Sequence, residues 1–269
     1  MAMRRLVPVA VALLFVLASC SAAVTPTPTP NPAIDQTAND HDYGGAPTGA
    51  SPSPSPSGPV VLAATEAPRV SLPLGERKVS AEGDFDCDGH ADRLEFFARI
   101  DAAPGVLARL VLATGAVHEL VLDAVDESSS LIGTADVNGD RCDDAIVSVG
   151  HGASTTWTSF LVYDRGDLRR VEENGKPVMF LFGGTVTHGN AIECRQVKDA
   201  LEIVARGISD YASDFQWEAV EDVHHWSTRS QLVLWSTSRS VIAVSIRNGM
   251  PPDQDRYWGL SCGTVKLPG

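Results

Sequence analysis

The sequence is short of basic residues, of long apolar runs and of helical patterning. Its 269 residues hold 21 Lys and Arg against 34 Asp and Glu, a net charge of −13. A surface of this sign repels phosphate backbones and attracts cations, so nucleic-acid binding is not expected. The apolar run at residues 6–18 is shorter than the roughly 20 residues that a membrane-spanning helix needs. No apolar pattern of helical period continues over three turns, which argues against a helical fold.

The N-terminal segment has the pattern of a secretory signal. Arg4 and Arg5 precede the apolar run, and small residues follow it. This order predicts a signal peptide over residues 1–19. The run ends in Leu17-Ala18-Ser19-Cys20, which resembles the lipobox of bacterial lipoproteins. The resemblance implies that Cys20 carries lipid and anchors the chain outside the cytoplasm, on the bacterial cell membrane. The alternative is a plain signal peptide with an incidental cysteine.

Residues 20–69 have the composition of a tether. They contain the repeats TPTPTPNP and SPSPSPSGP and few of the apolar residues that a core requires. Proline alternating with threonine or serine favours extended polyproline II, so this segment is expected to hold the following domain away from the lipid.

Residues 70–269 read as one all-β domain. Short segments rich in β-branched and aromatic residues are bounded by turn formers, which is typical of strands. The expected strands are 94–100, 106–113, 116–122, 145–150, 158–164, 201–207, 231–236 and 240–246.

Cysteine is scarce, and its count is informative. If Cys20 carries lipid, four of the five cysteines remain for two bridges in an oxidising compartment. Three pairings are possible. We favour Cys87 with Cys142 and Cys194 with Cys262, because Cys87 and Cys142 lie in two matching loops.

Those loops share a spacing of acidic residues. GDFDCDGHAD (83–92) places Asp84, Asp86, Asp88 and Asp92 at positions one, three, five and nine, and 52 residues later Asp136, Asn138, Asp140 and Asp144 occupy the same positions. A strand, a turn and further strands are expected after each loop. A third, worn copy is expected at 194–207, without the spaced aspartates. Repeats of about this length indicate arrays of small sheets that bury their faces against neighbours.

The spacing suits Ca²⁺, a hard cation that accepts six to eight oxygen ligands. A backbone carbonyl at position seven, from His90 or Cys142, would complete the set. Gly89 at position six permits a sharp turn. Arg141 stands at that position in the second loop, where positive φ costs a non-glycine residue on the order of 1 kcal/mol. The first loop is therefore expected to bind calcium more tightly.

The spacing of the loops fits two known calcium-binding patterns. Asp84, Asp86, Asp88, Gly89 and Glu95 also fit the helix-loop-helix calcium signature, which needs helices on both sides. The pattern D-x-[DN]-x-D-x-x-x-D entering a strand instead resembles the FG-GAP (VCBS-type) repeats of integrin α-subunit propellers and secreted bacterial proteins. That resemblance implies calcium ligands in both loops, at the eight side chains named above. With about three small antiparallel sheets, a partial or open propeller is expected.

Catalytic signatures are few. His151, Ser154 and His188 are the candidates for a hydrolase site, but the G-x-S-x-G motif of α/β-hydrolases is missing. Adjacent His224 and His225 would point to opposite sides of a strand, which disfavours a shared zinc. The sequence therefore predicts a non-enzymatic, calcium-stabilised lipoprotein that contacts protein or cell-wall glycan. An envelope hydrolase with an unrecognised active site is the alternative.

Overall fold

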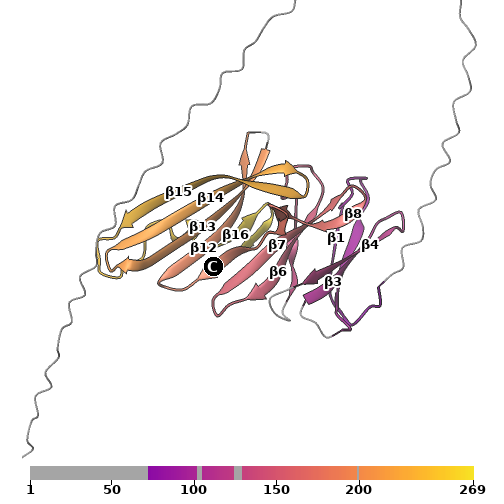
Figure 1. Ribbon diagram of the computed structural model, residues 1–269, viewed down its shortest axis with the longest axis horizontal. Coiled ribbons are helices and arrows are strands. Elements are labelled where there is room, and N and C mark those ends of the chain that lie inside the picture. The colour runs from indigo at the N-terminus through magenta and orange to yellow at the C-terminus, as the bar shows by residue number, and fades with distance from the viewer. Residues whose placement is uncertain (1–71, 102–104, 124–128, 199) are drawn as a thin grey trace, which may run out of the picture. The chain divides into compact units, whose positions relative to one another are not determined.

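Strands make up nearly all of the regular structure, as the segmental pattern of apolar and turn-forming residues predicts. The computed structural model describes residues 72–101, 105–123, 129–198 and 200–269 (Figure 1). The all-β prediction is confirmed, and the sheets are open and almost wholly antiparallel. Within the described ranges, no helix is long and apolar enough to cross a membrane. The expected signal peptide, Cys20 and the tether up to residue 69 lie outside the described residues.

The described strands form a smaller and a larger sheet. The smaller sheet consists of β1 (Arg77–Gly83), β2 (Asp92–Ala98), β3 (Gly105–Val111) and β4 (Val117–Asp123). The larger sheet consists of β5 (Ser130–Ala135), β6 (Asp144–His151), β7 (Thr155–Asp164), β8 (Asp167–Arg170), β9 (Glu172–Glu173), β10 (Lys176–Pro177), β11 (Phe180–Gly184), β12 (His188–Val197), β13 (Ala200–Ser213), β14 (Gln216–Thr228), β15 (Gln231–Ala243), β16 (Gly259–Cys262) and β17 (Val265–Leu267). One 3₁₀ turn, η1 (Gln254–Arg256), is the helical element among the residues described.

Strands β1–β4 and β5–β8 are two meanders with the same order of connections. In each, the first strand pairs antiparallel with the second, the second with the third, and the third with the fourth. A tight turn with a glycine at positive φ joins the last two strands, Gly115 in one meander and Gly166 in the other. The aspartate-rich loop joins the first two strands each time.

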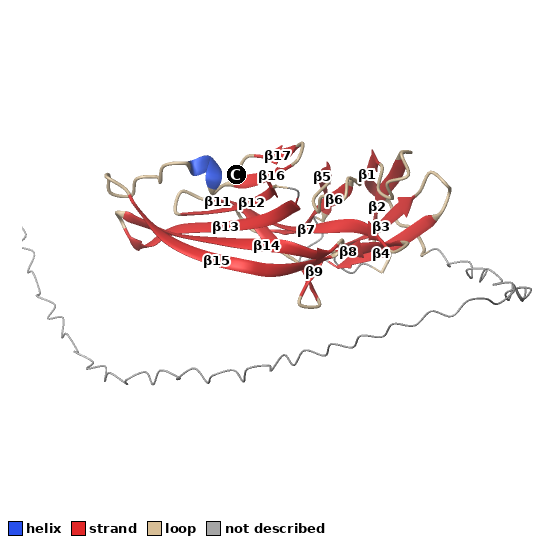
Figure 2. Ribbon diagram, turned by 90° about the horizontal axis from the view of Figure 1, so that it is seen from above, coloured by secondary structure: helices blue, strands red, loops and turns tan. Residues whose placement is uncertain are grey.

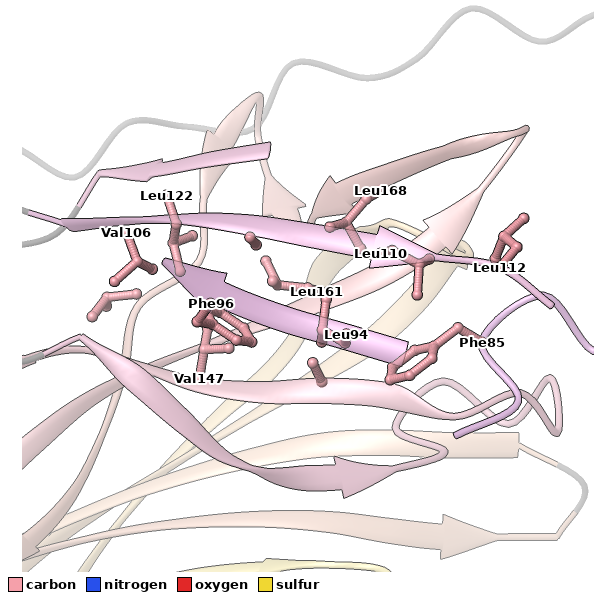
Figure 3. Packing of buried hydrophobic residues seen from close by; sticks show 13 residues of the cluster. Phe85, Leu94, Phe96, Val106, Leu110, Leu112, Leu122, Val147, Leu161 and Leu168 are labelled. Atoms are coloured by element: carbon pink, nitrogen blue, oxygen red, sulfur yellow. The ribbon is translucent and has the colours of Figure 1, made fainter. Parts of the chain in front are cut away.

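The middle layer, β6 and β7, is buried on both faces. Because side chains alternate along a strand, odd and even residues enter different cores. Ala145, Val147 and Leu161 pack against the β1–β4 sheet with Leu94 and Phe96 (Figure 3). The intervening side chains of β6 and β7 point to the opposite face. There Ile146, Phe160 and Val162 form a second buried cluster with Ile192, Ile203 and Leu260. The near-continuous apolar run of β6 follows from this double burial.

The number of sheets differs from the expectation. The strands form one four-stranded sheet and one 13-stranded sheet, where about three small sheets were expected. The reason is that β11 pairs with β7 and with β12, so hydrogen bonding continues without a break into the long strands β12–β15 (Figures 1 and 2).

The segment expected as a worn third copy, 194–207, lies in the antiparallel hairpin β12–β13, whose tight turn has Lys198 at positive φ; β13, β14 and β15 then pair antiparallel in chain order. One finer expectation was wrong. The two strands expected at 231–236 and 240–246 are one strand, β15. The intervening Thr237, Ser238 and Arg239 stay extended because β14 pairs with each of them.

Candidate functional site

The two aspartate-rich loops are connections of β-hairpins. The first loop, residues 84–91, joins β1 to β2, and the second loop, residues 136–143, joins β5 to β6. Strands stand on both sides of each loop, so the helix-loop-helix alternative is wrong. Position nine, Asp92 or Asp144, is the first residue of the returning strand.

Each loop gathers three carboxylates. In the first loop, Asp84, Asp86 and Asp88 each place one carboxylate oxygen within 4.8 Å of the other two. In the second, Asp136, Asp140 and the buried Asp144 meet the same limit. These are the hard oxygen donors that Ca²⁺ accepts, and each carboxylate has about four lone-pair sites, so one hydrogen bond leaves room for a cation.

The loops share an internal hydrogen-bond pattern. Position three accepts the N–H of position five, with Asp86 to Asp88 at 3.2 Å and Asn138 to Asp140 at 2.9 Å. Position five accepts the N–H of position seven at 2.8 Å (Asp88 from His90) and 2.9 Å (Asp140 from Cys142). Position nine accepts the N–H of position two at 2.9 Å (Asp92 from Phe85) and 3.0 Å (Asp144 from Val137), and position one accepts the N–H of position six at 3.1 Å (Asp84 from Gly89) and 2.9 Å (Asp136 from Arg141). Equal spacing in the sequence thus gives the same hydrogen bonds at these positions, although position one accepts its other N–H from Asp88 in the first loop and from Gly139 in the second.

An apolar side chain at position two holds each loop to a core. Phe85 is 1% exposed and belongs to the cluster between the sheets, and Val137 is fully buried in the second cluster. The polar side chains at alternate positions therefore turn away from the core, toward each other.

Backbone conformation does not separate the loops as the sequence suggested. Arg141 at position six has φ 72°, as expected where the first loop has Gly89 at 84°. Position four is also left-handed, with Cys87 at 62° in the first loop and Gly139 at 84° in the second. Each loop therefore holds one glycine and one non-glycine residue at positive φ, and the strain argument for tighter binding by the first loop no longer discriminates.

A neighbouring arginine does distinguish them. Arg229, in the turn between β14 and β15, places Nε 3.2 Å from Asp140 Oδ2. Its carbonyl also accepts a hydrogen bond from Asn138 Nδ2 at 3.3 Å. A cation entering the second loop would compete with this guanidinium for an Asp140 oxygen.

The two loops also differ at position nine, in the carboxylate oxygens that remain available to a cation. Both Asp92 oxygens accept backbone N–H groups, from Phe85 and from Ala113 at 2.8 Å, and Asp92 is not part of the 4.8 Å cluster of its loop. Asp144 belongs to its cluster. Burial raises the pKa of Asp144 well above its usual range, the Val137 N–H opposes this, and the nearby carboxylates, chiefly Asp140, raise it further. In the first loop, burial and then the charge of Asp92 raise the pKa of Asp86.

The two loops are joined directly. The Asp84 N–H donates to Asp143 Oδ2, and the Asp143 N–H donates to the Asp84 carbonyl, both at 2.9 Å. A disulfide links Cys87, at position four of the first loop, to Cys142, at position seven of the second. The second bridge joins Cys194 in β12 to Cys262 in β16. The favoured cysteine pairing is confirmed.

Sequence reasoning missed Asp143 and Arg229. Asp143 had a weak signal, because it is the one acidic residue of the second loop outside the shared spacing. Arg229 had none, because it is distant in sequence and reaches the loop only through the fold.

The two adjacent histidines that could have shared a zinc ion, His224 and His225, contact different partners. His224 Nδ1 is 2.8 Å from Glu173 and its ring packs edge-on against Phe180. His225 Nε2 is 2.8 Å from Glu202, and its ring stacks on Trp235. The adjacent pair thus points to opposite sides, as expected for a strand.

The segments that carry the other candidate catalytic residues are neighbours. The Ser154 carbonyl accepts the Gly184 N–H at 2.8 Å, and His188 Nδ1 lies 2.9 Å from Thr185 Oγ1. His151 ends β6 beside Thr156 of β7. These contacts tie the β6–β7 turn to the β11–β12 loop.

No protein-family profile, curated protein or solved structure matches this chain. The likeness to FG-GAP repeats and to bacterial lipoproteins therefore rests on the sequence motifs quoted above.

Proposed function

We propose that this chain is a lipid-anchored, non-enzymatic envelope protein whose two aspartate-rich loops bind Ca²⁺ and so stabilise an FG-GAP-like β domain for contact with protein or glycan. The observation that carries the proposal is the shared loop geometry, in which equivalent side chains accept equivalent backbone N–H groups and three carboxylates converge each time. Bonds from an aspartate to the N–H two residues on occur in many turns, but the bond from position two to position nine, which closes each loop onto its returning strand, recurs as well.

Calcium would act mainly on stability. Three carboxylates within 4.8 Å repel one another, and the buried Asp144 is held at a raised pKa. A bound cation offsets both penalties in the folded state alone. It stabilises the domain by about 2.7 kcal/mol when the calcium concentration is 100 times Kd. Because the two loops touch, the same ions would fix the arrangement of the two meanders.

A thermal melt tests this proposal. The full chain is melted with calcium, with magnesium and with chelator. Calcium is expected to raise Tm by several degrees and magnesium by less, since Mg²⁺ prefers strict octahedral geometry. The double variant Asp84→Asn/Asp136→Asn should lose the calcium-dependent rise, and the exposed control Asp255→Asn should keep it. Equal melting of the wild-type chain with calcium and with chelator would refute the proposal.

The contact role needs a separate measurement. A pull-down from envelope extract, run with calcium and with chelator, should recover a protein or glycan partner only when the loops are loaded. Recovery of nothing under either condition would leave the calcium result standing but would remove the contact role.

A further inference from the structure

A cavity of about 1140 Å³ lies beside β12 and β13. It is lined by the loop between β11 and β12, by β12 and β13 themselves, and by the last part of the chain, from Met250 onward. Figure 2 shows η1, in blue, beside β11, β12 and β13. Sites for small molecules measure roughly 300–1,000 Å³, so this cavity has room for a ligand of several rings. It is called the C-terminal cavity below.

Ion pairs join the charged side chains of the C-terminal cavity into a network. Arg206 Nη2 lies 2.6 Å from Glu193 Oε2, and Arg206 Nε lies 2.7 Å from Glu221 Oε2. Glu221 also accepts a hydrogen bond from Arg256 Nη2 at 2.8 Å, which ties η1 to β14. The Arg206 side chain is only 7% exposed, so the two carboxylates hold a nearly buried guanidinium in one orientation.

The charges around the C-terminal cavity compensate one another. The chain as a whole carries −13, but the cavity brings together four basic and four acidic side chains: Arg195, Arg206, Arg256 and Lys266 with Glu193, Glu202, Glu221 and Asp255. A charged ligand would have to take an arginine or a glutamate from its present partner, and a group left buried without its partner destabilises the complex. The balance therefore favours a neutral polar ligand.

Donors and acceptors stand side by side in this network. A guanidinium has five N–H donors, and the bonds from Arg206 to Glu193 and Glu221 use two of them. Each carboxylate has about four lone-pair sites. A hydroxyl group donates and accepts at once, so neighbouring hydroxyls on one ligand match an arginine beside a glutamate. The network is already held in place by its ion pairs, which lowers the entropy lost on binding.

An indole ring supplies an apolar contact in the C-terminal cavity. Trp258 lines the cavity and is half-buried. Its ring meets that of Trp217 edge-on, with centroids 6.0 Å apart. A Cβ on Gly189 would lie 2.5 Å from Trp258 Cε2, so β12 passes this close to the ring because residue 189 is glycine. These contacts fix the indole, and a fixed aromatic ring offers a large apolar surface at low entropic cost.

We propose that the C-terminal cavity binds a neutral saccharide, whose hydroxyls bond to the paired arginines and glutamates and whose ring C–H groups pack on Trp258. Sugars are the class of neutral molecule that combines an apolar ring face with many adjacent hydroxyls. A protein partner would instead be expected to use a broad surface of about 800 Å². The inference rests on the contact role proposed above and selects glycan over protein as the partner.

Calorimetric titration of the full chain tests the proposal. The probes are neutral trisaccharides of glucose, of mannose and of N-acetylglucosamine. At least one of them should bind with a Kd of about 1 mM or lower. A trisaccharide of galacturonic acid has the same hydroxyl-rich form with negative charge, and it should bind at least about tenfold more weakly than the best neutral probe because its carboxylates disturb the balanced network.

Two variants locate the binding site, each with a matched control. Trp258→Ala should raise the Kd at least about tenfold, and Trp235→Ala, which removes an exposed indole of β15, should leave it unchanged. Arg256→Gln should raise the Kd about fivefold or more, because a donor is lost and the charges no longer balance. Arg247→Gln breaks a single ion pair with Asp214, outside the residues that line the cavity, and should have no effect. Melting temperatures show that each variant is folded.

Three results would overturn the proposal. They are no binding of any neutral trisaccharide, binding of the charged trisaccharide as tight as that of the neutral ones, and a Kd that neither Trp258→Ala nor Arg256→Gln changes. The outcome is separate from that for calcium. If calcium raises Tm and no saccharide binds, the calcium proposal stands and this inference is wrong.

Discussion

Asp84 and Asp143 hold the two loops together through a reciprocal pair of hydrogen bonds, each 2.9 Å long. Asp84 is position one of the first loop and a member of its carboxylate cluster. Asp143 lies between the disulfide-bonded Cys142 and the buried Asp144. The loops are thus one connected unit, which makes the behaviour of either loop sensitive to the other.

Removing the Asp143 carboxylate should loosen this unit. Asp143→Ala leaves the Asp84 N–H without its acceptor, which costs about 1–3 kcal/mol of the free energy of unfolding. Asp143→Asn keeps an amide oxygen at the same place and should retain most of the stability. Chemical denaturation measures both. Similar losses in the two variants would show that the carboxylate charge, and not its role as acceptor, is what matters.

The disulfide between the loops should affect calcium binding as well as stability. The double variant Cys87→Ser/Cys142→Ser frees a connection across 55 residues of chain and should lose about 2–5 kcal/mol of unfolding free energy. It should also bind calcium more weakly, because the loops are no longer held together. Calcium titration of the folded variant is the measurement.

The matched control is Cys194→Ser/Cys262→Ser, whose bridge joins β12 to β16 and involves no loop residue. This variant should lose stability and keep the calcium affinity of the wild-type chain. If both double variants lose calcium affinity equally, the effect is one of general stability and the proposed coupling is wrong.

Arg229 should lower the calcium affinity of the second loop. Its guanidinium is 47% exposed, and an exposed ion pair is worth at most about 1 kcal/mol, so Arg229→Ala should tighten calcium binding there by up to about fivefold. Arg239→Ala removes the same charge from β15 and should have no such effect. Titration in an Asp84→Ala background isolates the second loop, and equal gains from both arginine variants would point to net charge alone.

Acid should weaken the fold through Glu221. Burial alone would raise its pKa, but hydrogen bonds from Arg206 and Arg256 outweigh burial, and the pKa is lowered in the folded chain. The unfolded chain therefore binds the proton more readily. The stabilisation is fully present above the usual value of 4.5 and is lost as the pH falls through the lower folded pKa.

Glu221→Gln should remove this part of the acid dependence. It should also destabilise the chain at neutral pH by about 1–3 kcal/mol, because Arg206, only 8% exposed, keeps Glu193 but loses its charged partner at residue 221. Unfolding free energies between about pH 3 and pH 7 give the comparison. A variant whose stability falls with acid as steeply as that of the wild-type chain would contradict the assignment.

The hairpins that carry the loops could be predicted because their signals are local. Alternating aspartates with glycine indicate a loop, and apolar β-branched runs such as AIVSVG indicate the strands that follow. The cysteine pairing was predictable for the same reason, since the loops match in sequence.

The full length of the long strands of the larger sheet, and the existence of β14, could not be predicted in the same way. β14 reads QWEAVEDVHHWST, and its acidic residues disfavour a strand by propensity. Those charges are compensated by other strands: Glu221 accepts from Arg206 of β13, and His225 contacts Glu202. Cross-strand pairs of this kind depend on register, which no single segment of sequence contains.

The most direct test of the central claim is a calcium titration that counts bound ions. The account predicts two calcium ions per wild-type chain, one in Asp84→Ala and one in Asp136→Ala, with the weaker site remaining in Asp84→Ala. No bound calcium at millimolar concentration, or two ions still bound in both variants, would contradict it.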